Sequence, residues 1–130
     1  MSDTPADATP DETPEEGAEQ APQPASVDQL RLGAGFREDE KERIVGLLRK
    51  LDRRLERWDA GQVDLTLSVK DRDTTKQRVV FELDVAKRRA EPLVATSTET
   101  DLRDALNEVR EDMWRQLDEM IERLVESRRR

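Results

Sequence analysis

Two stretches in the middle of the chain alternate hydrophobic and polar residues, which is the period-two pattern of a half-buried β-strand. The hydrophobic positions are Val63, Leu65, Leu67 and Val69 in residues 62–70, and Val79, Phe81, Leu83 and Val85 in residues 77–85. The polar stretch 71–75 between them predicts a turn, so the two strands form a hairpin. Two shorter segments, residues 27–32 and 92–97, are also interpreted as strands.

Two longer segments repeat their hydrophobic residues every three or four positions, which predicts amphipathic helices. In residues 38–58 the stripe consists of Ile44, Leu47, Leu48, Leu51, Leu55 and Trp58. In residues 101–126 it consists of Leu102, Leu106, Val109, Met113, Leu117, Met120, Ile121 and Leu124. Trp58 is expected in the core, and Trp114 is expected at the edge of the second stripe, partly exposed.

The predicted order of elements is β-α-β-β-β-α. Strands with one apolar face need cover on one side only, and two helices with single apolar stripes supply it. The first strand reaches the second through a helix, so this pair is expected to be parallel, and the remaining connections are hairpins. The fold class is therefore α+β, with a four-stranded sheet and two helices packed on one face.

Composition divides the chain into two parts. Residues 1–27 contain five of the six prolines and seven acids, but no Lys or Arg. We interpret them as a disordered acidic tail and residues 28–130 as the folded domain, because a segment with so few apolar residues cannot offset its ordering entropy. The tail is either a solubilising extension or a competitor of RNA phosphates for the domain's own basic surface.

The net charge of the whole chain differs from the net charge of the folded domain. The chain carries a net charge of −8, from 31 acids and 23 bases. Removing the seven acids of the tail leaves 24 acids against 23 bases, a net charge of −1. A basic surface that binds nucleic acid is therefore compatible with this acidic chain, provided that the bases are clustered.

Residue types missing from the chain narrow its chemistry. The sequence has no Cys, His or Tyr, so thiolate chemistry and the commonest general base and metal ligand are excluded. We expect no enzyme activity, no cofactor, no metal and no small-molecule substrate. The start of the chain lacks a signal peptide and no apolar run approaches a membrane span, so we expect a cytoplasmic protein without a membrane partner.

The candidate RNA-binding residues are the basic side chains of the first helix and of the loops. They are Arg43, Lys50, Arg53, Arg54 and Arg57 on one flank and the outer face of the first helix, Lys70, Arg72 and Lys76 around the hairpin, Lys87, Arg88 and Arg89 before the last strand, and Arg115 on the second helix. A basic stripe of this kind can follow a phosphate backbone. The alternative is an ordinary solvated face whose bases pair with neighbouring acids.

Four segments of the sequence form a recognisable set when they are taken in order. They read Arg54-Leu55-Glu56-Arg57-Trp58, then Val63-Asp64-Leu65-Thr66-Leu67-Ser68-Val69, then Val94-Ala95-Thr96-Ser97-Thr98-Glu99-Thr100-Asp101-Leu102-Arg103-Asp104-Ala105-Leu106, then Arg115-Gln116-Leu117. Together they resemble the ribosome hibernation-promoting factor and ribosome-associated inhibitor family, in a short and diverged form. The resemblance implies the same β-α-β-β-β-α fold. It also implies a factor that binds ribosomal RNA and proteins of the small subunit in the mRNA/tRNA channel, inhibits translation and stores inactive ribosomes under stress. The matched basic positions are Arg54, Arg57 and Arg115.

The second helix departs from the family, which has mostly lysines there. Its outer face carries Asp104, Glu108, Glu111, Asp112, Glu119, Glu122 and Glu126. This departure keeps an alternative open, in which the protein is a diverged interaction module of the same fold that uses the acidic face of the second helix to bind a basic partner.

Overall fold

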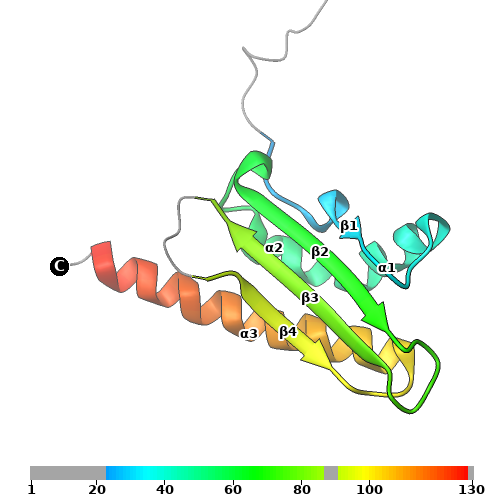
Figure 1. Cartoon of the computed structure of the whole chain (residues 1–130). Coiled ribbons are helices and arrows are strands. Elements are labelled where there is room, and N and C mark those ends of the chain that lie inside the picture. Colours follow the sequence, from blue (N-terminus) through cyan, green and yellow to red (C-terminus); the bar gives the residue numbers. More distant parts are fainter. Residues whose placement is uncertain (1–22, 87–90, 129–130) are drawn as a thin grey trace, which may run out of the picture.

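Four strands form one mixed sheet in the computed structural model, which describes residues 23–86 and 91–128 (Figure 1). The strands are β1 (Arg31–Leu32), β2 (Val63–Lys70), β3 (Arg78–Val85) and β4 (Leu93–Ser97), and they lie side by side in this order. β1 is parallel to β2, whereas β2, β3 and β4 are successively antiparallel. The predicted fold class and the parallel pairing of the first two strands are confirmed.

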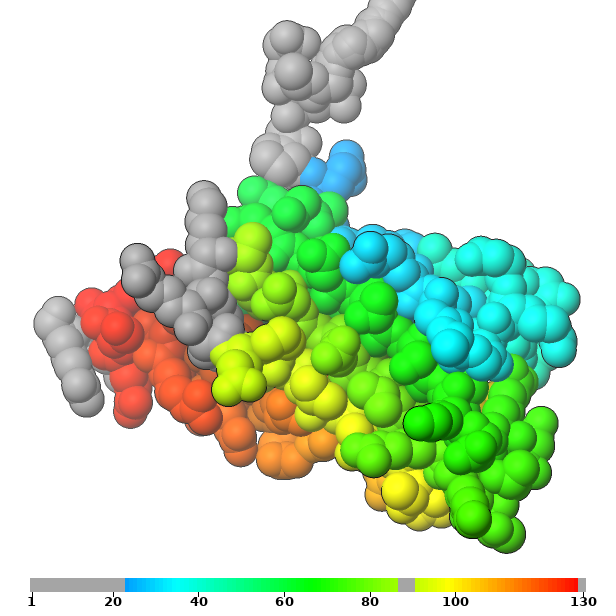
Figure 2. Space-filling model, in the orientation of Figure 1, coloured from blue at the N-terminus to red at the C-terminus, as the bar shows by residue number. Residues whose placement is uncertain are grey.

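The helices cover one face of this sheet, as predicted (Figure 1). They are α1 (Lys41–Leu48), α2 (Asp52–Leu55) and α3 (Leu102–Arg128). The opposite face of the sheet is open in the described residues, and Figure 2 shows it as a broad surface of strand side chains. None of the helices in the described ranges is both long and apolar enough to cross a bilayer.

The first helical region is less regular than the sequence predicted. Instead of one helix over residues 38–58, 3₁₀ turns at 38–40 and 49–51 precede α1 and separate it from α2, and the helix ends at Leu55. Hydrophobic spacing could not reveal this, because residues three apart share a face in both helix types. The break between α1 and α2 coincides with tertiary contacts at Asp52, the first residue of α2. The Asp52 carboxylate accepts a hydrogen bond from the Val27 N–H at 2.8 Å and pairs with Arg49 at 2.9 Å.

The start of the domain also differs from the prediction. Only Arg31–Leu32 of the predicted strand 27–32 is a strand, and Val27–Gln29 is a 3₁₀ turn capped by Ser26. Val27 and Leu30 are both buried, and their spacing of three fits a helical turn. Ala25 is buried as well, so the folded domain begins before residue 28. Residues 1–22, where the rest of the predicted tail falls, lie outside the described residues.

The core lies between the sheet and the helices. It contains the alternating residues of β2 and β3 and the stripe of α3 from Ala105 to Met120. Phe81 is fully buried, as predicted, whereas Trp58 and Trp114 are half-buried at the margin. The last turns of α3 extend past the sheet, so Leu124 is 38% exposed (Figure 1).

Candidate functional site

A line of polar bridges joins the first helical layer to α3. Arg110 of α3 donates a hydrogen bond to the Leu47 carbonyl at 3.0 Å, and Lys50 pairs with Glu111 at 2.8 Å. One turn further, Arg54 pairs with Asp118. Two bases of the predicted stripe, Lys50 and Arg54, therefore meet acids of α3 rather than acids of their own helix.

Trp114 lies beneath these bridges. The Lys50 ammonium is 4.7 Å and the Arg54 guanidinium 4.1 Å from the centre of its ring, which places two cations against one aromatic face. Hydrogen bonds from Lys50, and then from Arg110, lower the pKa of Glu111 below its ordinary value. The covered ring of Trp114 is not an open platform for base stacking.

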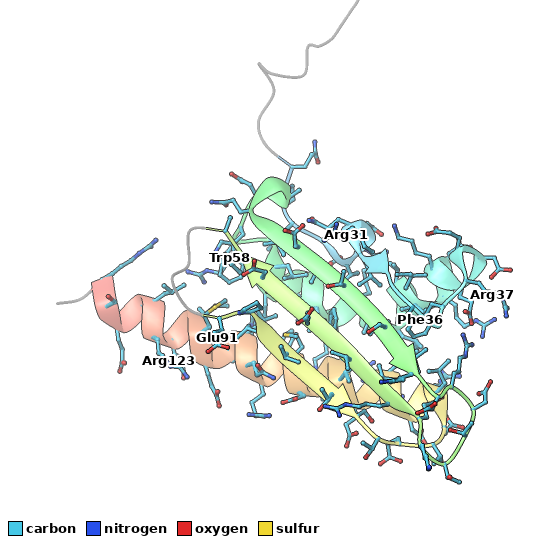
Figure 3. All side chains as sticks on the ribbon, in the orientation of Figure 1. Arg31, Phe36, Arg37, Trp58, Glu91 and Arg123 are labelled. Atoms are coloured by element: carbon cyan, nitrogen blue, oxygen red, sulfur yellow. The ribbon has the colours of Figure 1, made fainter. Side chains whose placement is uncertain are left out.

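Beyond the bridges, four arginines gather at the end of the helical layer. We call Arg53, Arg54, Arg57 and Arg128 the arginine cluster. The first three line one hollow of about 560 Å³ together with the acids Glu56, Asp118 and Glu122. Arg57 and Arg128 line an adjoining hollow of about 460 Å³ beside Trp58. Figure 3 shows Trp58 at the end of the sheet where β2 begins and β3 ends.

Arg53 and Arg57 differ from Arg54 because their charges are not paired with an acid among the described residues. Arg53 and Arg57 are exposed, and neither has an acid within ion-pair distance among the described residues. The guanidinium carbon of Arg57 lies 6.0 Å from the centre of the Trp58 ring, and Arg57 remains exposed. Exposed guanidinium groups of this kind can donate two hydrogen bonds to one phosphate.

The other predicted RNA-binding residues are dispersed. Lys70 and Lys76 are exposed at the hairpin, about 23 Å from the start of β2 by the rise of the strand. Arg72 is committed to Glu40 at 2.6 Å, and Arg115 pairs with Asp112 and Glu119 on α3. Arg43 lines a separate cleft. Lys87, Arg88 and Arg89 lie outside the described residues.

Sequence reasoning missed two basic positions, Arg103 and Arg128. Arg103 is seven residues from Arg110, so the two share a face of α3 that turns toward α1. That spacing was a usable signal. For Arg128 the sequence showed the run of three arginines at the end of the chain, which can either reach phosphate or complement the helix C-terminus, but its proximity to Arg57 depends on how far α3 extends.

The first described residues are bonded to the backbone that follows the first helical region. The Ala25 N–H donates to the Trp58 carbonyl, the Ala60 N–H donates to the Gln23 carbonyl, and Pro24 bridges to Asp59. Both hydrogen bonds are 2.8 Å long. Residues 23–25, which lead back to residues 1–22, are therefore bonded to Trp58–Ala60, the three residues that follow Arg57 in the sequence.

Within residues 23–86 and 91–128, no three carboxylates gather closely enough to hold a metal ion. No family model matches the chain, and no curated protein matches it.

Proposed function

We propose that this protein binds the small ribosomal subunit in the mRNA/tRNA channel, inhibits translation and stores inactive ribosomes in the cytoplasm under stress. The observation that carries the proposal is the arginine cluster, in which Arg53 and Arg57 are exposed without an acidic partner among the described residues. The resemblance of the sequence to hibernation factors supports the same conclusion, since Arg54 and Arg57 are among its matched positions.

Ribosomal RNA suits this surface because it presents phosphates in a fixed shape. Contacts from arginine to phosphate position a protein without reading sequence, and folded RNA is recognised largely by its backbone and grooves. If binding neutralises about six phosphates, affinity falls with salt with a log–log slope of about −4 to −5. Arg72 and Arg115 are left out of the proposed surface because their guanidinium groups are paired and neither residue lines the hollows of the arginine cluster.

The first prediction concerns the two unpaired arginines. Replacing them in the double variant Arg53→Gln/Arg57→Gln is expected to weaken binding to small subunits by roughly tenfold or more, and to reduce the salt slope by about two, because each lost phosphate contact removes about one unit. Co-sedimentation with purified small subunits at several salt concentrations measures both quantities. The matched control is Arg31→Gln. Arg31 is a base on the open side of the sheet, where it pairs with Asp64 at 3.7 Å. Equal loss in the control contradicts the proposed surface.

The interaction-module alternative is favoured by the outer side of α3. Asp104, Glu108 and Glu126 are exposed there and have no ion pair among the residues that the structure describes. The variant Glu108→Lys separates the two functions, because it is expected to leave ribosome binding intact or to strengthen it. If Glu108→Lys abolishes association with a basic partner while the arginine variant does not, the alternative replaces the ribosome proposal.

The second prediction concerns the acidic segment that precedes residues 23–25. Replacing its seven Asp and Glu residues with Asn and Gln in the full chain is expected to tighten binding to small subunits several-fold at low salt, because these carboxylates compete with phosphate for the same arginines. The difference is expected to shrink at high salt, where both attractions are screened. Unchanged affinity at low salt contradicts competition and leaves the segment as a solubilising extension.

A further inference from the structure

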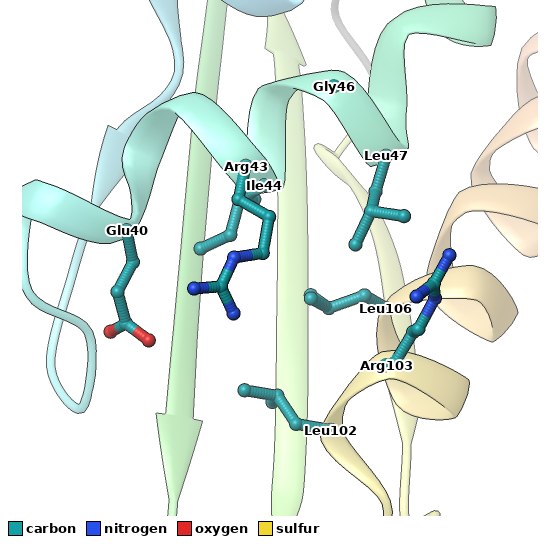
Figure 4. Close-up of a pocket in the computed structure, with 8 residues that line it drawn as sticks. All are labelled: Glu40, Arg43, Ile44, Gly46, Leu47, Leu102, Arg103 and Leu106. Carbon is teal, nitrogen blue, oxygen red and sulfur yellow. The ribbon is translucent and has the colours of Figure 1, made fainter.

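A cleft of about 310 Å³ opens between α1 and the first turns of α3, away from the arginine cluster (Figure 4). Its apolar wall comes from both helices, with Ile44 and Leu47 on α1 and Leu102 and Leu106 on α3. Ile44 and Leu106 are each 3% exposed, and Leu47 and Leu102 are half-buried. A hydrocarbon group placed here would be removed from water on two sides.

Two arginines flank this apolar wall. Figure 4 shows Arg43 reaching from α1 toward α3, and Arg103 reaching from α3 toward α1. Arg43 and Arg103 are both exposed, and neither has an ion-pair partner among residues 23–86 and 91–128. The entrance of the cleft therefore favours an anion.

The one carboxylate at the cleft does not cancel this charge. Glu40 accepts hydrogen bonds from Arg72 at 2.6 and 2.8 Å and from the Arg37 N–H at 2.9 Å. Both of its oxygens are thus occupied, and the local balance is one neutralised acid against two unpaired bases.

Gly46 lines the cleft and leaves its rim without a side chain at this position. It lies inside α1, where glycine costs helix stability, and a Cβ at this position would meet no heavy atom within 4 Å. Packing within the domain therefore does not require glycine here, and the missing side chain widens the approach to the apolar wall.

We propose that this cleft binds a small organic anion with an apolar body, such as a medium-chain carboxylate. The apolar body packs on the leucines, and the carboxylate pairs with one of the two flanking arginines, Arg43 or Arg103. The size of the cleft corresponds to about ten water-sized groups, which matches a ligand of about ten non-hydrogen atoms and lies at the lower end of small-molecule pockets. The proposal does not depend on ribosome binding, because it uses neither Arg53 nor Arg57.

The probe that fits this description is octanoate, added to the full-length, isotope-labelled protein and followed by amide chemical shifts. A ligand of this size is expected to bind with a dissociation constant on the order of 0.1–1 mM. The largest shifts are expected at Leu47, Leu102 and their neighbours. Octan-1-ol, which has the apolar body without the charge, is expected to bind at least several-fold more weakly because it cannot pair with the arginines.

Three variants test the assignment. Arg43→Gln/Arg103→Gln is expected to weaken octanoate binding about tenfold, and Gly46→Trp is expected to abolish it by filling the open rim. Arg53→Gln is the control, expected to bind octanoate like the wild type. The proposal is overturned if octanoate causes no saturable shifts at the cleft up to about 10 mM, ten times the weakest expected constant, or if octan-1-ol binds as tightly. Loss of ribosome binding in Arg53→Gln/Arg57→Gln with octanoate binding retained identifies two independent sites.

Discussion

Replacing Gly35 with alanine is expected to destabilise the domain by about 3 kcal/mol. Gly35 has a φ of +93°, which L side chains rarely adopt. A Cβ at this position would lie 2.3 Å from the carbonyl oxygen of Val69 and 2.4 Å from the Cγ1 of the same valine. Either the loop or β2 has to move to accommodate it.

Movement here is costly because the loop is bonded to the strand. The Gly33 N–H donates to the Leu67 carbonyl at 2.7 Å, and the Val69 N–H donates to the Ala34 carbonyl at 2.9 Å. These bonds continue the pairing of β1 with β2 past Leu32 and hold the backbone of Gly35 against Val69. Displacing Gly35 therefore strains two backbone hydrogen bonds as well as the turn.

Urea and thermal unfolding of Gly35→Ala measure this cost, with an expected drop in Tm of roughly 12–20 °C for a domain of this size. Gly46→Ala is the matched control. Because its Cβ would meet open space in a helix, it is expected to raise stability by about 0.5–1 kcal/mol. If the two alanine variants shift stability in the same direction, the close approach at Gly35 is not what determines the effect.

The second large effect is expected from Arg72→Met, which should cost about 2–3 kcal/mol at pH 7. Arg72 binds both oxygens of Glu40, donates to the Gly35 carbonyl at 2.9 Å and lies over the Phe36 ring at 5.5 Å. Methionine retains an apolar stem against Phe36 and removes the charge. The buried carboxylate of Glu40 then loses its cation.

The pH dependence of this effect has a definite sign. The hydrogen bonds from Arg72, followed by that from the Arg37 backbone, lower the pKa of Glu40 from its ordinary 4.5 to about 2. A lowered pKa in the folded state adds stability that is complete above the ordinary value and is lost as the pH falls from about 5 toward 2. The stability difference between the wild type and Arg72→Met is therefore expected to be largest at pH 7 and to shrink toward zero near pH 2.

Urea unfolding at pH 7, 4 and 2.5 tests this expectation. Glu40→Gln serves as a second variant, because it removes the titrating group while keeping a side chain that accepts hydrogen bonds. Its stability is expected to depend less on pH than that of the wild type over the same range. A constant difference between wild type and Arg72→Met at all three pH values would show that Arg72 acts through packing alone.

The candidate site was only partly predictable from the chain. Seven-residue and three-residue spacings placed Arg43, Lys50, Arg54 and Arg57 on one flank of the first helical region, and the structure places side chains of this flank at the interface with α3. What the spacing could not give was the partner of each base. Lys50 and Arg54 meet acids that lie 61 and 64 residues away in sequence, whereas Arg53 and Arg57 meet none in the described ranges.

Local pattern determined the strands, the long α3 helix and the single buried face of each element, because side-chain period depends only on neighbouring residues. The tertiary structure decided the rest. It divided the first helix into α1 and α2, turned residues 27–29 into a 3₁₀ turn, and committed Arg72 to Glu40. These outcomes depend on contacts between segments that are far apart in the chain. The physical reason is that a buried charge or backbone polar group is stable only when a hydrogen-bond or ion-pair partner lies beside it, and that partner belongs to a distant segment.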